Sequence, residues 1–564
     1  MKPLLSALND IPEYRSLLAA IDGGACPAAL SGLSAVHRAH FAAGIRQETG
    51  RPVVVVCADE GEAERMTRDL AALSGEEVRT LSAREFTFHN AAVVSRQYEH
   101  RRLSVLRALA AGECSLLVCT AEAVLQRTLP KALLEGASRV LRMGESHDLN
   151  QLAETLTAAG YTRCEQVEGA GQFALRGGIL DFFSPSQAKP VRVEFFGDEI
   201  DAMGLFDPDT QRRVENIGTA EILPAAEVLP QLSPGGFAGL VELLDGVISR
   251  AKRRKGAEKL ISTLEEDREK LASGLTFPAM DRYMALIYPQ MATAADYFPA
   301  DAVVVLSESP RVAERGKNYL WQLTEDAKTL MERGELAGEL AEFARSFEEL
   351  AEVLDAWPVC YLDSFTSSQY PRRPRTLLNL LAKQLPSYGA SLETAVSDLA
   401  HYVSDGFRTV VLVGSEQRAL NLQALLREQG RKTAVDFQLH DLPAHGQAVI
   451  AVGGLTAGME YPVGRLAVLT EGQSILGKKR KSKPVTNRQK LDSYADLSPG
   501  DLVVHEHHGV GRFLEMTKMT VDGVEKDYVK IAYAGADVLY VPATQLDLVS
   551  KYIGSGEDAN ETKK

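Results

Sequence analysis

The run of four valines at residues 53–56 constrains the fold more than any other feature of this sequence. Consecutive β-branched apolar residues predict a strand buried on both faces, as in the parallel sheet of an α/β protein. Strand-like segments at residues 78–81 and 115–120 follow, separated by helical patterns at 60–73 and 98–111. This alternation predicts a parallel α/β layer over the first ~125 residues.

The remaining chain predicts further domains of different type. Residues 138–214 hold short strand-like segments punctuated by Gly-Gly, Ser-Pro and Gly-Asp, which favours a small inserted α+β domain. A long charged helix is expected at 252–272, and a second small α/β unit at 345–470. Residues 497–554 are nearly all short strands with tight turns, as in a small all-β barrel. The fold class is therefore α/β multidomain.

The sequence Gly-Gln-Ser-Ile-Leu-Gly-Lys-Lys at 472–479 comes one residue short of a phosphate-binding loop. The pattern G-x-x-x-x-G-K-[ST] needs a hydroxyl for Mg²⁺ where this chain has Lys479, and it must open a helix. Seven Lys or Arg and one proline in residues 477–490 oppose a helix there. We interpret the stretch as a basic linker.

The α/β layer itself is expected to carry a nucleotide loop before its first long helix. Laid over the same pattern, Gly32 keeps the first glycine, but His37 replaces the second, Arg38 the lysine and Ala39 the hydroxyl residue. The metal-binding acid is expected at the end of the strand at 302–306, where Ser307 and Glu308 stand instead. These changes predict a degenerate nucleotide site that does not bind nucleotide.

Composition excludes several other classes of protein. The formal charge, 62 − 76 = −14, argues against a surface that wraps nucleic acid by bulk attraction. Six scattered cysteines with no C-x-x-C pair predict a reduced, cytoplasmic protein without disulfides or a zinc site. No run approaches the ~18 apolar residues of a membrane span. His505, His507 and His508 have no further ligand at a usual spacing, so we expect no metal.

Several segments resemble known proteins. Residues 172–181 (QFALRGGILD), 190–200 (PVRVEFFGDEI) and 206–213 (FDPDTQRR) resemble the inserted domain shared by the excision-repair helicase UvrB and the transcription-repair coupling factors. Residues 94–106 and 296–309 are similar to flanking UvrB segments, and 497–552 resemble the CarD-like RNA polymerase-interacting domain, which UvrB lacks. The combination is typical of the coupling-factor family.

The resemblance implies a domain division. It gives a degenerate, RecA/helicase-like layer, an inserted UvrA-binding domain, a second part of the layer, a small α/β domain, a basic linker, a CarD/Tudor-like barrel and a polar tail. In that order the expected ranges are 1–128, 129–214, 215–344, 345–472, 473–495, 496–554 and 555–564. The family's ATP-driven DNA translocase is expected after the barrel, so ATP, Mg²⁺ and most DNA contacts are expected only in that motor, which this sequence lacks.

Two partner sites follow from the resemblance. Family residues matching Arg176, Arg192 and Phe196 contact UvrA, and a segment matching Thr517, Lys518, Met519 and Thr520 docks on the β subunit of RNA polymerase. In residues 191–196 alternation puts Arg192, Glu194 and Phe196 on one strand face. From the residues alone, two solvated arginines, a covered Phe and a purely structural hairpin remain alternatives.

We therefore expect an adaptor without catalytic residues that binds stalled RNA polymerase and recruits UvrA. Two rival functions are an ATPase or helicase of the UvrB type, which needs an intact nucleotide loop, and a stand-alone CarD-like transcription regulator, which needs no UvrA contact. The cluster of cations at 252–255 is interpreted as a solvated face, and the glycine string at 453–458 is too weak to predict a cofactor loop.

Overall fold

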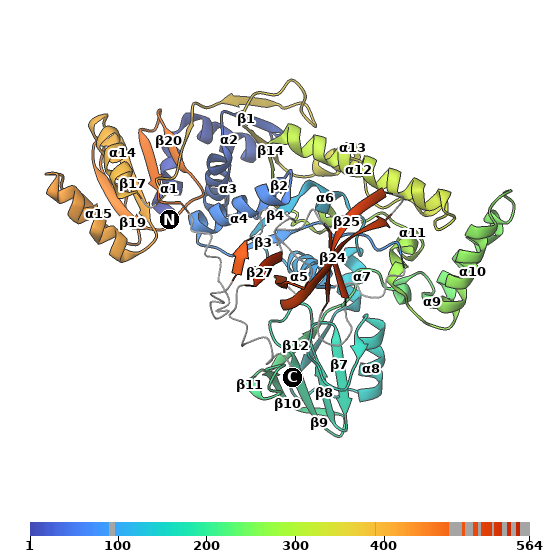
Figure 1. Ribbon diagram of the computed structural model, residues 1–564. Coiled ribbons are helices and arrows are strands. Elements are labelled where there is room, and N and C mark those ends of the chain that lie inside the picture. The colour runs from blue at the N-terminus through green and yellow to red at the C-terminus, as the bar shows by residue number, and fades with distance from the viewer. Residues whose placement is uncertain are drawn as a thin grey trace. The chain divides into compact units, whose positions relative to one another are not determined.

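The computed structural model describes residues 1–89, 96–389, 391–472, 488–490, 500–505, 509–521, 524–532, 538–542 and 549–552. The chain divides into two compact units, Met1–Gln473 and Ser474–Lys564 (Figure 1). None of the helices described combines the length and the apolar content that crossing a bilayer requires.

A seven-stranded parallel sheet is the centre of the first unit. Its strand order is β15-β1-β14-β13-β2-β4-β3, and β2 contains the four valines, all buried. Because strand side chains alternate, Val53 and Val55 enter one core and Val54 and Val56 another. The predicted parallel α/β layer is confirmed. The strands are Thr376–Asn379, Ala28–Ser31, Val359–Asp363, Val303–Ser307, Val53–Cys57, Leu116–Thr120 and Val78–Leu81, in the order given.

Helices cover both faces of this sheet. On one face, α3 and α4 bury nearly continuous apolar stripes, and α4 is capped by the Asp59 carboxylate, which accepts from the Glu62 N–H. On the other face, α5 and α6 pack with the helices that follow the inserted domain. The helices named here, with the shorter ones of the same region, are α1 Lys2–Ser6, α2 Pro12–Asp22, α3 Ala35–Thr49, α4 Glu60–Ser74, α5 Gln97–Ala110, α6 Ala121–Leu125 and α7 Lys131–Ala137.

The inserted α+β segment holds a six-stranded sheet of order β11-β10-β9-β8-β7-β6. A two-stranded ribbon of β5 and β12 joins the segments that enter and leave it, and Phe173, Phe182 and Val193 lie in its core beneath helix α8. The elements are β5 Arg139–Arg142, α8 Leu149–Ala158, β6 Thr162–Arg163, β7 Gln172–Arg176, β8 Ile179–Phe182, β9 Val191–Phe196, β10 Glu199–Phe206, β11 Arg213–Asn216 and β12 Thr219–Ile222.

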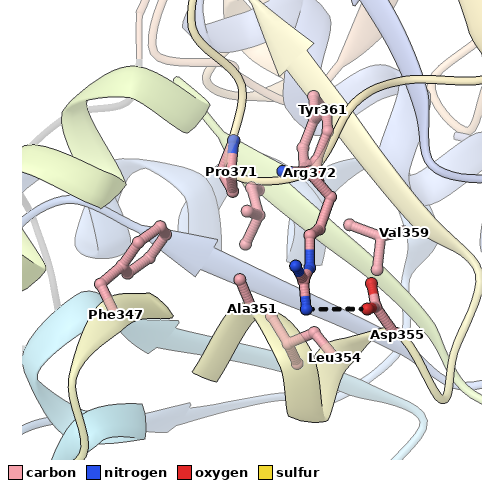
Figure 2. Close-up of a pocket in the computed structure, with 9 residues that line it drawn as sticks. Phe347, Ala351, Leu354, Asp355, Val359, Tyr361, Pro371 and Arg372 are labelled. Atoms are coloured by element: carbon pink, nitrogen blue, oxygen red, sulfur yellow. Dashed lines mark hydrogen bonds and ion pairs between the residues drawn. The ribbon is translucent and has the colours of Figure 1, made fainter. Parts of the chain in front are cut away.

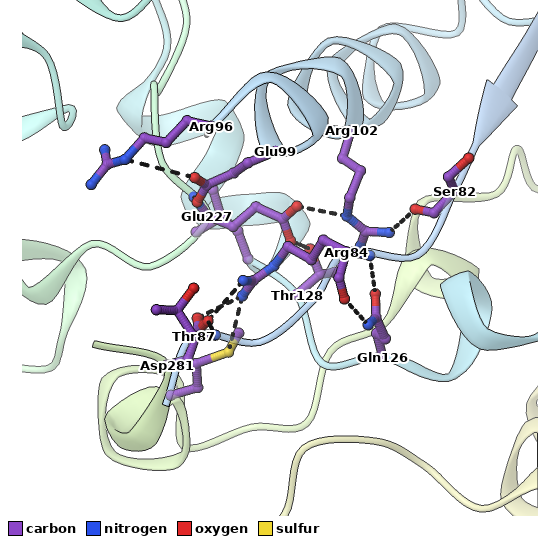
Figure 3. A network of polar contacts seen from close by, with 12 residues as sticks. Ser82, Arg84, Thr87, Arg96, Glu99, Arg102, Gln126, Thr128, Glu227 and Asp281 are labelled. Atoms are coloured by element: carbon purple, nitrogen blue, oxygen red, sulfur yellow. Dashed lines mark hydrogen bonds and ion pairs between the residues drawn. The ribbon is translucent and has the colours of Figure 1, made fainter. Parts of the chain in front are cut away.

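A buried polar network holds the chain where it leaves the inserted segment, after β12 (Figure 3). The Glu227 carboxylate accepts from Arg102 Nε at 2.7 Å and from Thr128 Oγ1 at 2.7 Å, and the Glu227 N–H donates to Glu99 at 2.6 Å. Arg84 lies 3.5 Å from the same carboxylate. Arg84 also makes two bonds to the Asp281 carboxylate, at 2.8 and 2.9 Å. These contacts tie the returning chain to α5 and to the region around Asp281.

The expected single helix at 252–272 is wrong. A first helix, α9 (Gly236–Ala251), ends before the four cations, and α10 (Glu258–Ala272) begins after them. Gly256 adopts φ +78°, a left-handed conformation that breaks the helix between them. Asp267 on α10 is buried and accepts from Arg282 and Tyr283, which docks the hairpin. Helices α11 Met284–Ile287, α12 Ser309–Glu332 and α13 Phe347–Leu354 complete this region.

A second α/β sheet, of strand order β16-β20-β21-β17-β19-β18, lies after residue 380. It is mixed: β17 pairs in parallel with β19 and β21, whereas β20 is antiparallel to β21. Its elements are β16 Lys383–Leu385, α14 Leu392–Ser404, β17 Arg408–Val413, α15 Glu416–Glu428, β18 Ala434–Val435, β19 Ala448–Val452, β20 Gly458–Tyr461 and β21 Leu466–Thr470.

The second unit is an antiparallel six-stranded sheet of order β22-β27-β23-β24-β25-β26. Its strands β24 and β25 pair as an antiparallel hairpin. Residues 488–490, at the end of the basic stretch, form β22. The strands are β22 Arg488–Lys490, β23 Leu502–His505, β24 Gly509–Val521, β25 Val524–Ala532, β26 Val538–Pro542 and β27 Val549–Tyr552.

Candidate functional site: a closed nucleotide position and two partner faces

Arg38 fills the degenerate nucleotide position with protein contacts. From the first turns of α3, its Nε donates to Ser307 Oγ at 2.8 Å, its Nη1 to Glu308 at 2.5 Å and its Nη2 to Glu62 at 3.2 Å. Ser307 Oγ in turn donates to Glu62 at 2.7 Å. The side chain is buried, and all three of its nitrogens bond to protein oxygens. The structure thus brings Arg38, Ser307 and Glu308 together as an internal ion cluster.

The loop amides around this position also bond within the chain. The Gly32 N–H donates to the Ser364 carbonyl at 3.2 Å, and the Leu33 N–H to the Asp363 carbonyl at 3.0 Å. Gly32 has φ +93°, and a Cβ there would stand 1.8 Å from the Leu380 carbonyl oxygen. Position 32 therefore requires glycine, because the backbone of Leu380, just after β15, leaves no room for a side chain. In a phosphate-binding loop such amides face the ligand instead.

His37 and Ala39 are buried in α3 and serve packing. The His37 ring lies edge-on to Tyr461, with 4.9 Å between centroids, and its Nδ1 bonds Ser34 Oγ at 2.6 Å. Burial lowers the pKa of His37 to about 3, and that of His40, one turn on, to about 4. Both rings are therefore neutral at physiological pH. The residues present do not fit Mg²⁺ and a nucleotide phosphate.

Asp363, at the end of β14, borders this cluster. It is buried and accepts from the Ser309 N–H at 2.6 Å and the Ser309 hydroxyl at 3.0 Å. Burial raises its pKa to about 6, and nearby Glu308 acts in the same direction. At the start of the same strand, Val359, Tyr361 and Arg372 line a hollow of about 10 Å³. Arg372 forms an ion pair with Asp355 at its border (Figure 2). That volume holds about one water molecule.

The inserted segment presents an exposed polar face. Val191 and Val193 point into the core, whereas the alternate residues of β9 point outward and Phe196, its last residue, is 84% exposed. The alternation predicted for this strand is confirmed. On the same face, Arg176 ends β7 with a side chain that is 55% exposed, opposite the partly exposed Ile179. Exposed aromatic and arginine side chains on one face are typical of a protein interface.

A buried carboxylate joins the two predicted arginines. Asp181 on β8 accepts from Arg176 Nη2 at 3.0 Å and from Arg192 at 2.7 and 2.8 Å. Arg192 also lies over the Phe206 ring, 4.7 Å from its centroid, and its side chain is only 19% exposed. The hydrogen bonds to Asp181 raise the pKa of Arg192. Sequence reasoning missed Asp181, although a lone acid in the strand Ile-Leu-Asp-Phe was the available signal.

The predicted polymerase-binding residues, Thr517, Lys518, Met519 and Thr520, lie on β24. They pair with Tyr528, Asp527, Lys526 and Glu525 of β25, in that order. On its other side β24 pairs with β23 at residues 509–512. Phe513 also exchanges backbone hydrogen bonds with Gly500 and Asp501 on that side, and among the described residues no strand pairs with 514–521 there. This stretch therefore offers a strand edge.

The remaining candidates are the histidine cluster, the near-match loop and the glycine string. Within the part of the chain that the structure describes, no three His, Cys, Asp or Glu side chains gather as a metal site; His505 lies on β23, and His507 and His508 lie outside that part. Residues 473–479 of the near-match loop also lie outside it. In the glycine string, Thr456 bonds to the buried Asp69, so this loop packs against α4.

Comparison with known proteins agrees with this geometry. The family described as the UvrB interaction domain matches residues 140–227, and the family described as the CarD-like/TRCF RID domain matches residues 497–553. The transcription-repair-coupling factor of Bacillus subtilis (strain 168) is 27% identical over 563 residues, covering 98% of this chain and 47% of its own length. That of Staphylococcus aureus (strain MRSA252) is 28% identical over 544 residues, covering 95% and 46%.

The chain spans about half the length of these curated relatives. Each matched family falls on one of the two surfaces described above, the polar face of the inserted segment and the strand edge of the second unit. Over nearly all of its own length, the chain is thus homologous to the transcription-repair-coupling factors, and it carries a UvrB interaction domain together with a CarD-like domain.

Proposed function

We propose that this chain is the recruiting part of a transcription-coupled nucleotide excision repair factor. It binds the β subunit of stalled RNA polymerase through β24 and recruits UvrA through the inserted domain. The observation that carries the proposal is the presence of both matched domains in one chain, the first with the exposed Phe196 and the second with an unpaired stretch of β24. A stand-alone transcription regulator would need only the second of them.

For UvrA the docking group is Phe196 together with Arg176, which lies on the same face of the sheet, two strands away. A phenylalanine that is 84% exposed is poorly placed in water, and a partner pocket that buries it gains apolar contact area. Arg176 supplies a cation for a carboxylate at the pocket rim, where charge complementarity sets orientation. This combination of an aromatic anchor and an arginine is typical of binding hot spots.

For RNA polymerase the docking group is the edge of β24 around residues 517–520. A strand of the β subunit can add to this edge, with main-chain hydrogen bonds giving affinity and alternate side chains giving specificity. In unit two, β24 is the longest strand described, with 13 residues. Its length leaves room for a partner strand beyond the stretch that β23 covers.

Nucleotide hydrolysis has no part in the proposed function of this chain. The cation, hydroxyl and acid that a nucleotide site needs are replaced by Arg38, Ala39 and Ser307, and the arginine is neutralised internally. ATP, Mg²⁺ and DNA translocation then belong to the portion of the longer relatives that this chain does not match. The six free cysteines support a reducing compartment, the cytoplasm, as the place of action.

Two separable variants test the proposal. Phe196→Ala is expected to reduce UvrA binding and leave polymerase capture intact, whereas Met519→Arg is expected to abolish polymerase capture and leave UvrA binding intact. Both are measured with purified partners, by calorimetry for UvrA and by pull-down for RNA polymerase, with circular dichroism to check the fold. If each variant keeps both partners, or loses both while folded, the assignment of the two surfaces fails.

A further inference from the structure

The polar face of the inserted domain is organised around Asp181. This carboxylate is 1% exposed, yet three N–H donors from Arg176 and Arg192 reach it within 3.0 Å. Its strand β8 lies between β7 and β9, so the side chain sits between the two arginines. A buried charge of this kind is costly unless it is paired and hydrogen-bonded on every side.

The two arginines differ in what they can offer a partner. Arg192 is held on both sides of its guanidinium, by the Asp181 carboxylate and by the Phe206 ring, and its Nη1 donates to the Gln211 carbonyl at 3.3 Å. Phe206 itself is fully buried in a small apolar cluster with Val167 and Ala174. Among the described residues, Arg176 bonds through its side chain to Asp181 alone, by Nη2, and more than half of that side chain is open to water.

From this difference we propose that Asp181 is a positioning residue of the partner-binding face. Asp181 and Arg192 form a fixed, buried pair, and Asp181 holds Arg176 in the orientation that meets a partner carboxylate, on the sheet face that also carries Phe196. Arg192 acts mainly as a support and Arg176 as the contact. The inference rests on the proposed function, since it describes how the same UvrA-binding face is organised.

Preorganisation explains why such a residue matters. A free arginine side chain has many rotamers, and ordering it on binding costs conformational entropy that weakens association. Because Arg176 is already bonded to Asp181 in the folded protein, this entropy is lost on folding and not on binding. Asp181 also removes one positive charge from the face, so deleting it would strengthen binding to an acidic partner if bulk charge alone decided affinity. The two effects have opposite signs, which makes the proposal testable.

The test uses the full chain and purified UvrA in calorimetric titrations. Asp181→Asn, which keeps the shape of the side chain, is expected to weaken binding at least tenfold. The double variant Asp181→Asn/Arg176→Ala is expected to bind no more than about twofold weaker than Arg176→Ala alone, because Asp181 acts through Arg176. The proposal is overturned if Asp181→Asn leaves UvrA binding unchanged or makes it tighter. It is also overturned if the fold-losses of the two single variants multiply in the double variant.

Controls separate this outcome from a loss of fold and from failure of the proposed function. Asp267→Asn removes a carboxylate of similar burial and similar arginine pairing from α10, and it should leave UvrA affinity unchanged. If Asp181→Asn does not fold, Arg192→Lys keeps the charge but loses the paired bonds; a several-fold loss supports the proposal and unchanged affinity overturns it. If neither Arg176→Ala nor Phe196→Ala weakens binding, the proposed UvrA site itself is wrong.

Discussion

Two arginine–carboxylate clusters of this chain use the same groups in opposite ways. At the predicted nucleotide position, Arg38 is 4% exposed and donates hydrogen bonds to Ser307, Glu308 and Glu62. On the inserted domain, Asp181 is buried just as deeply, but one of its arginines, Arg176, remains largely exposed. The first cluster is closed on itself, and the second keeps one cation for a partner.

The difference separates a cluster that is complete within the chain from one that is not. Buried acids are stable without a bound cation when the chain itself supplies the positive charge, and Arg38 does this for Glu62 and Glu308. A docking face needs the reverse arrangement, an incomplete set of contacts that only the partner completes. Four measurements sharpen or break this contrast.

The largest effect is expected for Arg38→Met. It leaves the buried Glu62 and the partly buried Glu308 without their cation, which should lower the free energy of unfolding by about 3–5 kcal/mol. Urea denaturation measures the change. Adding Glu62→Gln and Glu308→Gln to this variant should recover much of the loss. As a control, Arg311→Met removes an exposed pair with Asp59 and should cost less than about 1 kcal/mol. Equal losses in both variants would contradict a closed cluster.

The pH dependence of stability probes the border of the same cluster. The pKa of Asp363 is raised from an ordinary 3.8 to about 6, so the folded protein binds the proton more tightly than the unfolded chain does. The stability that this proton confers is complete below about pH 4 and is lost as the pH rises through 6, by about 2–3 kcal/mol. Asp363→Asn should remove this loss when unfolding free energies at pH 4 and pH 7 are compared. Identical pH profiles for the two proteins would refute it.

On the docking face, Phe196→Ala should weaken UvrA binding by about 2 kcal/mol, a typical hot-spot loss. The chain offers a matched control: Phe365 is equally exposed, at 84%, but lies in the loop after β14. Phe365→Ala should leave the affinity unchanged in the same titration. A comparable loss from both substitutions would mean that exposed apolar area, rather than the inserted face, governs the association.

The smallest expected effect is that of nucleotide on the closed cluster. A ligand at one hundred times its dissociation constant stabilises a protein by about 2.7 kcal/mol, which is several degrees in melting temperature. With millimolar MgATP we expect a shift below about 1 °C, equal to that with Mg²⁺ alone. A clear MgATP-specific rise, or release of inorganic phosphate by the pure protein, would restore the rival ATPase function.

Local pattern predicted the elements of this fold better than it predicted their contacts. The valine run and the alternation of β9 gave correct strands because each depends only on neighbouring residues. The break before α10 was missed because charged residues, which are compatible with a helix, lie on both sides of it. Gly256 was the local sign of the turn. The substitutions at Arg38 and Ser307 were visible in the sequence. The part played by Glu62 was not, because it is distant in sequence from both residues that it bonds. Asp181 likewise emerged only from the register of three strands.

The network around Glu227 has a mechanical consequence. Glu227 follows the strand by which the chain comes back from the inserted domain, and its carboxylate, its N–H and its carbonyl are all bonded, the last by the Tyr288 hydroxyl at 2.8 Å. The returning chain is therefore fixed to the parallel-sheet region at three separate groups of one residue. Loss of the Glu227 carboxylate is expected to loosen the base of the inserted domain without changing its own sheet.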